Sequence, residues 1–389
     1  KRQKLERDIS PEDKTIWFHC ASLGEFEQAL PIIQATKKLF KGHKIIISFF
    51  SPSGYEIKKN SDIAHSIVYL PLDTISNAKE FIAKAHPSLA IFVKYEFWPN
   101  YLFELKKNQI PTLLVSGLFR ANQSFFKPHG AFMRKVLLSF NHFFVQDSDS
   151  QDLLKTIKIT NTTISGDTRF DRVSNQTEQD NTLRFLDTFK DSSMCVVCGS
   201  TWPEDEIILL DAINSRTVDV KYVVAPHKID ASKIDIFRRK ITKPTIQYSE
   251  IFSKSGALQE DKLINSKVII IDKIGLLTKI YSYADIAYVG GAAGNTGLHN
   301  ILEPATFGIP IITGTNFDKF PEAKKLQQLA GLYSVKSAED FSQILSKLIS
   351  DISFRSKTGM IAGDFIKNNT GATKKIMDYI EKLNRDGVV

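Results

Sequence analysis

The sequence has few cysteines and no long apolar run. Its three cysteines, Cys20, Cys195 and Cys198, are too few for a disulfide framework in 389 residues and suit a reducing compartment. Cys195 and Cys198 have the spacing of a redox or zinc motif, but residues three apart in one strand point to opposite faces, so we expect them in the core. No apolar stretch is long enough to span a bilayer.

The composition is that of a soluble globular protein, with 42% hydrophobic and 24% charged residues. A chain of this length is expected to form two domains rather than one core. The net charge of +8 favours an anionic partner, which on charge alone is a nucleic acid, an anionic lipid or a phosphorylated substrate.

Short apolar runs alternate with helical patterns along the whole chain, which predicts α/β architecture with parallel, doubly wound sheets. The polar run from Ser174 to Asn181 is expected to be the linker. We therefore expect domains at 1–175 and 176–389, with the closing amphipathic helix (370–386) packing back on the first domain. In the first domain we expect strands at 15–18, 44–49, 67–70, 89–93, 112–116 and 143–146, and in the second at 195–198, 221–225, 268–271, 286–289 and 311–313.

The stretch from Ala284 to Gly314, ADIAYVGGAAGNTGLHNILEPATFGIPIITG, predicts a buried strand, a glycine-rich loop and a helix. A loop of this kind followed by a helix N-terminus is a ready site for an anion. Glu303 is expected in the first helical turn, where a carboxylate can accept hydrogen bonds from vicinal hydroxyl groups. The pattern favours a nucleotide-sugar pocket, and the alternative is a turn whose glutamate only complements the helix dipole.

Glu25 follows the first strand in His19-Cys20-Ala21-Ser22-Leu23-Gly24-Glu25, at a strand-to-helix junction where ligands bind in α/β sheets. The helix N-terminus favours a charged carboxylate, which suits a general base, although a helix-start glutamate without chemistry is the alternative. Asp147-Ser148-Asp149 resembles a metal-binding aspartate pair, but N-capping of the next helix is the simpler interpretation. The sequence shows no zinc-ligand spacing and no nucleophile elbow.

Several stretches, taken in order, resemble the 3-deoxy-D-manno-octulosonic acid (Kdo) transferase family. They span nearly the whole chain and comprise 19–25 (HCASLGE), 96–100 (EFWPN), 166–171 (GDTRFD), 199–202 (GSTW), 225–227 (APH), 272–275 (DKIG) and 298–305 (LHNILEPA). The resemblance implies a glycosyltransferase B fold, with two Rossmann-like domains facing each other across a cleft. It implies transfer of Kdo from CMP-Kdo to the lipid A precursor (lipid IVA) in lipopolysaccharide biosynthesis, with inversion at the anomeric carbon and without a metal or other cofactor.

The same resemblance assigns the site residues. Glu25 matches the family's general base. Glu96 is the competing catalytic carboxylate, and the aromatic residues Tyr95, Phe97 and Trp98 around it indicate that it positions the acceptor. The residues expected to bind the donor are Ser200, Thr201, His227, Lys273, Gly275, Gly291, Gly297, Asn300 and Glu303. Those expected on the acceptor side are Ser22, Gly24, Ser53 and Arg120. Two positions depart from the family pattern near the acceptor side: Lys94, where many members have a glutamate, and Ser116-Gly117-Leu118, where many have Asn-Ala-Arg.

A basic stretch with interleaved aromatic residues runs from Phe119 to Lys135. It suits the phosphate groups of an anionic inner-membrane surface, although an ordinary helix with one core face explains it equally well. No nucleic-acid motif accompanies it, so we expect no nucleic acid. We expect the protein at the cytoplasmic face of the bacterial inner membrane. We expect it to be held there either peripherally or by an N-terminal anchor that is absent from this chain. The given sequence opens without a methionine.

Two other functions fit parts of the pattern. One is a different B-fold enzyme, a nucleotide-sugar transferase or epimerase that acts on another nucleotide. The other is an inactive homologue that binds the membrane peripherally, and the presence of both Glu25 and Glu303 argues against this loss of function.

Overall fold

The structure is a computed structural model, which describes residues 2–215, 220–253 and 255–389. The contacts divide the chain into two compact units. Unit 1 comprises Lys1–Arg172 and Asn369–Val389, and unit 2 comprises Val173–Asn368. The division falls inside helix α8 (Thr168–Ser174), a few residues before the boundary expected from the polar run. Part of that run forms a short 3-10 helix, Asn175–Glu178.

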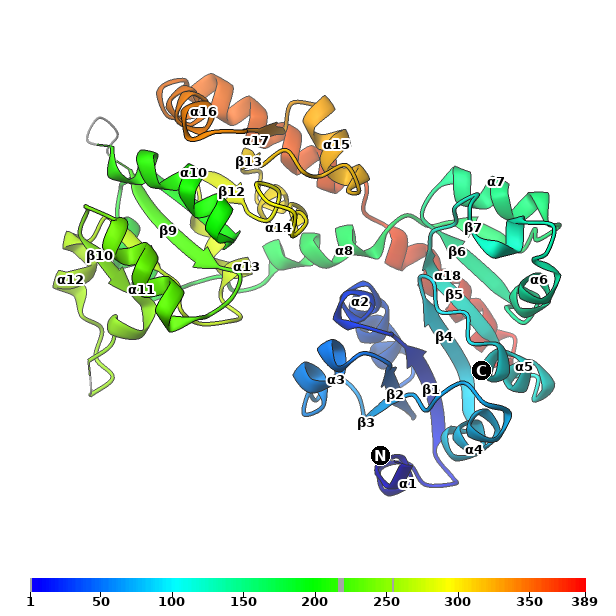
Figure 1. The fold of residues 1–389 in the computed structure, drawn as a ribbon. Helices are drawn as coiled ribbons and strands as arrows, with labels where there is room; N and C mark the ends of the chain where they lie inside the picture. The colour runs from blue at the N-terminus through cyan, green and yellow to red at the C-terminus, as the bar shows by residue number, and fades with distance from the viewer. Residues whose placement is uncertain (1, 216–219, 254) are drawn as a thin grey trace. The chain divides into compact units, whose positions relative to one another are not determined.

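Unit 1 is built around one parallel seven-stranded sheet with the strand order β3-β2-β1-β4-β5-β6-β7 (Figure 1). The strands are β1 (Lys14–His19), β2 (His43–Phe49), β3 (Ser66–Tyr69), β4 (Pro87–Val93), β5 (Thr112–Gly117), β6 (His142–Val145) and β7 (Thr162–Ile164). The helices that precede the chain division are α1 (Arg2–Asp8), α2 (Leu23–Leu39), α3 (Pro52–Lys58), α4 (Ile75–Ala85), α5 (Pro99–Lys107), α6 (Ala131–Leu137) and α7 (Ser148–Thr156).

Each face of this sheet has its own core because neighbouring residues of a strand point to opposite faces. Ile16 and Phe18 of β1 pack in one cluster, whereas Trp17 between them packs in the other with Phe92 of β4. The near-continuous apolar runs in the sequence therefore belong to strands that are buried on both faces.

Unit 2 repeats the design with a second parallel seven-stranded sheet, in the order β10-β11-β9-β8-β12-β13-β14. Its strands are β8 (Cys195–Thr201), β9 (Lys221–Pro226), β10 (Thr245–Gln247), β11 (Val268–Ile270), β12 (Ile286–Val289), β13 (Ile311–Thr313) and β14 (Leu332–Ser334). Its helices are α9 (Arg184–Lys190), α10 (Pro203–Asn214), α11 (Ala231–Lys240), α12 (Glu260–Asn265), α13 (Leu277–Ile280), α14 (Leu302–Thr306), α15 (Pro321–Gln328), α16 (Ala338–Ser350) and α17 (Ile352–Lys367). The prediction of a doubly wound α/β fold is confirmed.

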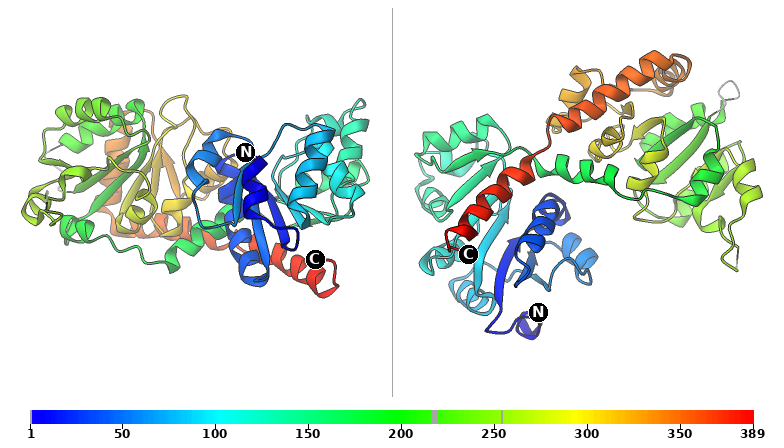
Figure 2. Two further views of the ribbon diagram at one scale, coloured as in Figure 1. Left: turned by 90° about the horizontal axis from the view of Figure 1, so that it is seen from below. Right: turned by 180° about the vertical axis from the view of Figure 1, so that it is seen from behind.

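The closing helix α18 (Ala372–Arg385) belongs to unit 1, where it packs on α2 and lies against the sheet (Figure 2). Ile376, Met377 and Ile380 join one of the two cores of unit 1. The start of α18 is held by Asp171, whose carboxylate accepts hydrogen bonds from the backbone N–H groups of Gly371 and Thr373, both at 2.6 Å.

The two cysteines of β8 lie in the two opposite cores of unit 2, and burial raises the pKa of the Cys195 thiol to about 12 and that of Cys198 still further. Core packing is therefore confirmed. Asp147 caps α7, with its carboxylate accepting the Ser150 N–H at 2.7 Å, as the capping interpretation predicts. Among the described residues, no helix has the length and apolar character needed to cross a bilayer.

Candidate functional site

Each sheet has one switch point, where the strand order reverses direction from the central strand. In unit 1 it lies between β1 and β4, and in unit 2 between β8 and β12. Ligands of open α/β sheets bind outside the carboxyl ends of the strands at such a point. The motifs singled out in the sequence follow these four strands: Glu25 follows β1, Glu96 follows β4, Ser200 ends β8, and Gly291 follows β12.

Glu25 is half-buried at the third position of α2 and forms a capping box with Ser22. Its Oε2 atom accepts a hydrogen bond from the Ser22 N–H at 2.9 Å and another from the Ser22 hydroxyl. The helix-start role considered from the sequence is thus present in the structure. These hydrogen bonds use only Oε2 of Glu25, and Oε1 accepts no hydrogen bond from the described residues. Capping orients this carboxylate and leaves an oxygen for a ligand.

Three of the residues expected on the acceptor side lie at two helix starts that pack against each other. Ser22 and Gly24 flank the first turn of α2, and Ser53 lies in the first turn of α3, where its N–H donates to Ser51 Oγ at 3.3 Å. The two turns pack closely at Gly54, where a Cβ would lie 3.1 Å from the Leu23 nitrogen and would overlap the Phe49 ring. The structure therefore brings Ser22, Gly24 and the segment that carries Ser53 together.

Glu96 lies in the loop between β4 and α5, with a side chain 15% exposed. Its Oε2 atom accepts a hydrogen bond from Trp98 Nε1 at 2.7 Å and faces His19 Nε2 at 3.3 Å. Burial, followed by the charges of Glu25 and Glu96, raises the pKa of the Cys20 thiol. Because β1 and β4 are parallel neighbours, the two predicted carboxylates, which follow their carboxyl ends, lie at the same edge of the sheet.

Tyr95, the residue before Glu96, lies beside Arg120. The Arg120 guanidinium carbon lies 6.0 Å from the Tyr95 ring centroid. Burial raises the pKa of Tyr95; the charges of Arg120 and Arg169 act against this rise, and that of Glu25 adds to it. The predicted acceptor cation thus lies over the ring of the residue that precedes Glu96.

The aromatic stretch from Phe119 to Lys135 is mostly core rather than a lipid-facing surface. Phe119 and Phe125 are 3% exposed and pack in the core of unit 1, and the Arg134 guanidinium donates to the carbonyl oxygens of Phe125 and Lys127. Only Phe132 among its aromatic side chains is a large exposed hydrophobic group, at 60%. Of the two interpretations that the sequence left open, core packing therefore holds for Phe119 and Phe125, whereas Phe132 is exposed.

In unit 2, the glycine loop after β12 is tied to the start of α10 by Asp205. The fully buried Asp205 carboxylate accepts hydrogen bonds from the N–H groups of Trp202 at 2.9 Å and Gly291 at 2.8 Å, and from the Tyr288 hydroxyl at 2.8 Å. Burial raises the pKa of this carboxyl. Gly291 has φ +97°, and a Cβ there would lie 2.1 Å from the Gly297 carbonyl oxygen, so only glycine fits the turn.

Three rings stack beside this loop. The His227 ring lies 4.8 Å from Trp202 and 4.2 Å from His299, and Trp202 Nε1 donates to His299 Nε2 at 2.9 Å. The hydrogen bond places the proton of neutral His299 on Nδ1. Burial and the neighbouring His227 lower the pKa of His299 to about 4, and burial with Lys228 lowers that of His227. Both rings are therefore neutral at pH 7.

Glu303 is held on both oxygens at the start of α14. Oε2 accepts a hydrogen bond from the Thr278 hydroxyl at 3.0 Å, and Oε1 accepts one from Asn300 Nδ2 at 3.2 Å. The helix itself spans only Leu302–Thr306, and the loop before it runs from Gly290 to Ile301. The predicted order of strand, glycine-rich loop and helix is thus confirmed, with Glu303 in the first helical turn and its carboxylate oriented by Asn300 and Thr278.

The remaining predicted donor residues lie at other strand ends of this sheet. Ser200 has φ +54°, an uncommon conformation for a non-glycine residue, which often marks a functional position. The Thr201 hydroxyl donates to Glu206 at 3.4 Å, and its carbonyl oxygen accepts the His227 N–H. Lys273 Nζ lies over the Tyr248 ring, 5.6 Å from its centroid. Gly275 has φ +98° in the exposed loop after β11.

Gly297 lines a cavity of about 230 Å³ in unit 2. The other lining residues include Asn316, Lys319 and Phe320, none of which was predicted from the sequence. Asn316 Nδ2 donates to the Gly294 carbonyl oxygen at 2.8 Å, which links the cavity wall to the glycine loop. Amides, an ammonium group and loop N–H groups are donors suited to an anionic sugar or phosphate.

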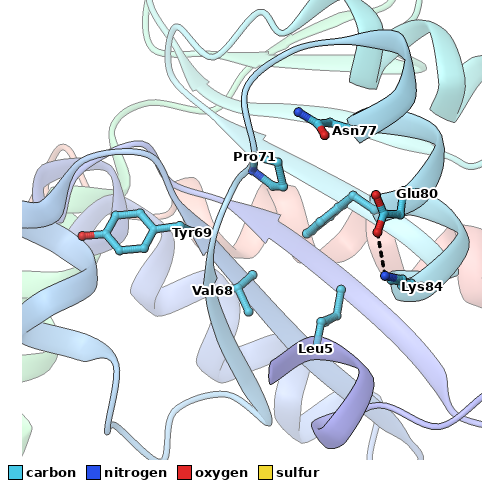
Figure 3. A pocket seen from close by; sticks show the side chains of 8 residues that line it. Leu5, Val68, Tyr69, Pro71, Asn77, Glu80 and Lys84 are labelled. Atoms are coloured by element: carbon cyan, nitrogen blue, oxygen red, sulfur yellow. Dashed lines mark hydrogen bonds and ion pairs between the residues drawn. The ribbon is translucent and has the colours of Figure 1, made fainter. Parts of the chain in front are cut away.

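A smaller pocket of about 40 Å³ lies between α1, β3 and α4 in unit 1 (Figure 3). Its lining is mostly apolar, and the ion pair between Glu80 and Lys84, at 2.7 Å, lies beside it (Figure 3). It contains none of the predicted site residues. Within the described ranges, no group of three or more His, Cys, Asp or Glu side chains is arranged to hold a metal ion.

Sequence reasoning missed several polar residues that hold the predicted ones in place. Asp205, Thr278 and Ser48 belong to none of the quoted motifs, and their hydrogen bonds to Gly291, Glu303 and His19 join segments remote in sequence. Trp202 and His299 do lie in quoted motifs. Their motifs lie in adjacent loops, which is a signal that the two side chains contact each other. The sequence does not show which nitrogen of His299 accepts the hydrogen bond.

The comparisons with known proteins agree with this geometry. Residues 1–172 match the model of the family described as 3-Deoxy-D-manno-octulosonic-acid transferase (kdotransferase). The chain is 27% identical over 361 residues to the 3-deoxy-D-manno-octulosonic acid transferase of Aquifex aeolicus (strain VF5), covering 90% of this chain and 92% of that protein. It is 26% identical over 386 residues to the transferase of the same name from Haemophilus influenzae (strain ATCC 51907 / DSM 11121 / KW20 / Rd), covering 95% and 87%.

Among solved structures, UDP-GlcNAc 2-epimerase from Neisseria meningitidis, bound to UDP-GlcNAc, superposes with a TM-score of 0.64 at 14% identity, covering 95% of this chain and 100% of that chain. This likeness shows the fold, which is the glycosyltransferase B fold with two Rossmann-like units. The family match over residues 1–172 and the similarity over nearly the whole chain show that the protein is related to the Kdo transferases, which are glycosyltransferases.

Proposed function

We propose that the protein transfers Kdo from CMP-Kdo to the phosphorylated glucosamine disaccharide of the lipid A precursor (lipid IVA), with inversion at the anomeric carbon, in lipopolysaccharide biosynthesis. The observation that carries the proposal is that Glu25, Glu96, Ser200 and Gly291 lie at or after the carboxyl ends of the four strands that flank the two switch points. Unit 2 binds the donor, and unit 1 binds the acceptor and supplies the base.

The donor is held by groups of unit 2 that match its chemistry. Glu303, oriented by Thr278 and Asn300, accepts hydrogen bonds from the ribose hydroxyl groups of CMP. The N–H groups of the glycine loop, Lys273 and the donors around Gly297 bind the phosphate and the Kdo carboxylate. These donors stabilise the charge on the departing CMP, so the proposed reaction uses no metal or other cofactor.

The acceptor hydroxyl needs a base because a primary alcohol is too weak an acid to attack unaided. Glu25 takes this proton as the hydroxyl oxygen bonds to the anomeric carbon of Kdo, and the bond from that carbon to the CMP phosphate oxygen breaks with its electron pair going to CMP. The support is that Ser22 holds Oε2 of Glu25 and leaves Oε1 without a partner among the described residues. Glu96 and Arg120 position the acceptor.

The acceptor is an amphiphile, so we place the enzyme peripherally at the cytoplasmic face of the bacterial inner membrane. Unit 1 exposes large apolar side chains in the loops and helices that follow β2 and β3: Phe50 (45%), Ile57 (63%), Leu72 (67%) and Ile75 (64%). These side chains, with the cations Arg120 and Lys127, are suited to a surface of acyl chains and phosphates.

Mass spectrometry of the lipid formed from CMP-Kdo and a tetra-acylated, bisphosphorylated precursor tests the reaction. We expect one or more added Kdo groups, and CMP, rather than UDP, should stabilise the protein in thermal unfolding. A ligand at 100 times its Kd stabilises by about 2.7 kcal/mol. No Kdo product, together with stabilisation by UDP alone, would refute the proposal and favour a UDP-sugar enzyme of the same fold.

Glu25→Gln tests the base. We expect turnover to fall by about 10²–10⁴-fold, the usual contribution of general-base catalysis, with unchanged CMP affinity. Glu27→Gln, two residues along the same helix, is the control. Near-normal turnover of Glu25→Gln in a radiolabelled Kdo-transfer assay would exclude Glu25 as the base.

A further inference from the structure

The structure contains a buried chain of hydrogen bonds that ends on Glu96. His19, the last residue of β1, is fully buried, and its ring lies between Ser48 of β2 and Glu96 after β4. The Nδ1 atom lies 2.8 Å from Ser48 Oγ, and Nε2 lies 3.3 Å from Glu96 Oε2. Trp17 Nε1 donates to Ser48 Oγ at 2.8 Å. Four side chains from two strands and one loop therefore form one polar path through an otherwise apolar core.

The chemistry of the end groups determines the direction of this chain. An indole N–H can only donate, so Ser48 Oγ accepts from Trp17 and is left with its own proton to donate. A carboxylate can only accept, so Nε2 of His19 carries a proton and donates to Glu96. In the neutral ring, Nδ1 then accepts from the Ser48 hydroxyl. Every hydrogen bond in the chain has a defined donor and acceptor.

Glu96 consequently has one oxygen bound and one available. Oε2 accepts from both His19 and Trp98, whereas Oε1 accepts no hydrogen bond from the described residues. The Trp98 ring meets the His19 ring edge-on at 5.5 Å, so packing also holds both donors in place. A side chain held on one oxygen in this way presents the other in a fixed direction.

We propose that His19 is a positioning residue for acceptor binding, which acts by holding Glu96 through this chain; Ser48 and Trp17 set its tautomer. The identity of the ligand rests on the proposed function. The ligand is a hydroxyl or amide donor of the acceptor sugar, which donates to Oε1 of Glu96. A buried histidine in this role explains why a polar ring lies at the end of β1 among the aromatic side chains of Trp17, Phe92 and Trp98.

The first experiment does not require activity. Ring ¹⁵N NMR of the full chain labelled at histidine should show His19 protonated at Nε2 and unprotonated at Nδ1. Loss of that signal in His19→Gln assigns it. A ring protonated at Nδ1 alone would overturn the proposal, whether or not the protein transfers Kdo.

The second experiment is a double-mutant cycle on transfer kinetics. His19→Leu removes the donor to Glu96, and a hydrogen bond to a charged group corresponds to roughly a 10-fold to 100-fold rise in KM for the acceptor. The donor KM should not change. In a Glu96→Ala background, His19→Leu should cause no further rise, because its effect passes through Glu96. Equal rises in both backgrounds would overturn the proposal.

Rescue and control variants separate positioning from structural damage. His19→Gln places an amide N–H near the position of Nε2 and should restore most of the acceptor affinity. His142→Leu removes another histidine of the same sheet, whose ring contacts Thr163 at 2.9 Å, and should leave the acceptor KM unchanged. If His19→Leu does not fold, Ser48→Ala is the decisive variant. It should raise the acceptor KM, whereas His19→Gln should not. An unchanged acceptor KM in Ser48→Ala would refute the positioning role of His19.

Discussion

Replacement of Asp205 tests whether one buried carboxylate holds the donor loop of unit 2. Asp205 joins the start of α10 to the glycine loop through the N–H groups of Trp202 and Gly291, and it also accepts the Tyr288 hydroxyl. Asp205→Leu keeps the approximate size of the side chain and removes both acceptor oxygens. We expect a folded but less stable protein with weakened CMP binding, because Gly291 loses the group that fixes its place.

The size of the effect follows from the donors left behind. Each buried N–H group without a partner costs about 1–3 kcal/mol, so the two backbone donors together cost about 2–6 kcal/mol of the free energy of unfolding. A whole protein is stable by only about 5–15 kcal/mol. The Tyr288 hydroxyl adds to the loss unless it rotates to another acceptor. The expected destabilisation is therefore large.

Asp205→Asn should be much milder. Its carbonyl oxygen can replace Oδ2, which accepts both backbone N–H groups, and its amide can donate to the Tyr288 hydroxyl oxygen.

The Asp205→Asn substitution also removes the pH dependence of stability that arises from the Asp205 carboxyl. Burial raises the pKa of Asp205 above its ordinary value of 3.8, so ionisation is less favourable in the folded protein. The protonated Asp205 carboxyl therefore contributes to the free energy of unfolding of the wild type at low pH. This contribution is lost as pH rises from 3.8 through the raised pKa, whereas the Asn variant shows no such loss.

Urea unfolding at pH 7, with and without CMP, measures both effects, and Asp211→Leu on the exposed side of α10 is the control. The expected order of stability is wild type close to Asp205→Asn, and both well above Asp205→Leu. Equal stability and equal CMP affinity for the Leu and Asn variants would show that the hydrogen bonds to the loop do not matter, and would refute the reasoning.

Three further predictions concern other residues. Glu303→Ala should weaken CMP binding by roughly 1.5–3 kcal/mol without unfolding the protein, and unchanged affinity by calorimetry would remove Glu303 from the site. His299, whose pKa is lowered to about 4, stabilises the fold above the ordinary histidine pKa of 6.5 and loses that contribution as pH falls from 6.5 through 4. The melting temperature should therefore drop less in His299→Gln than in wild type over this range, and equal drops would contradict it. Vesicles with anionic lipid should bind the protein and release it as salt rises, because attraction is screened beyond about 10 Å at 0.1 M. Charge reversal at Arg120 and Lys127 should weaken co-sedimentation, and indifference to both changes would place any membrane face elsewhere.

The sequence alone was enough to predict most strands and the fold class. The strands predicted in unit 1, such as 44–49 and 89–93, are buried on both faces, so their apolar runs are nearly continuous. The strands β7, β10 and β14 were missed: each has three residues and lies at a sheet edge. A three-residue edge strand is defined by pairing with its neighbour, and no local pattern of that length separates it from a turn.

Among the candidate site residues, those placed at strand ends were accessible to sequence reasoning. Glu25 lies at the helix start after the first apolar run, and Gly291 lies in the loop just after another, so their places at the carboxyl edge could be derived from position along the chain. The aromatic residues between Phe119 and Lys135 could not be assigned, because the same spacing serves a core and a lipid surface. Only packing showed that Phe119 and Phe125 are buried.

The tertiary structure alone decided which polar side chains support the site. Asp205 contacts a residue 86 positions away, and His19 contacts one 77 positions away. Such contacts depend on strand order, since β1 meets β2 and β4 while β8 meets β12. Strand period and loop composition are local properties that a sequence carries directly. The partner of a buried carboxylate or histidine is set by which strands become neighbours, and that is decided only when the sheets assemble.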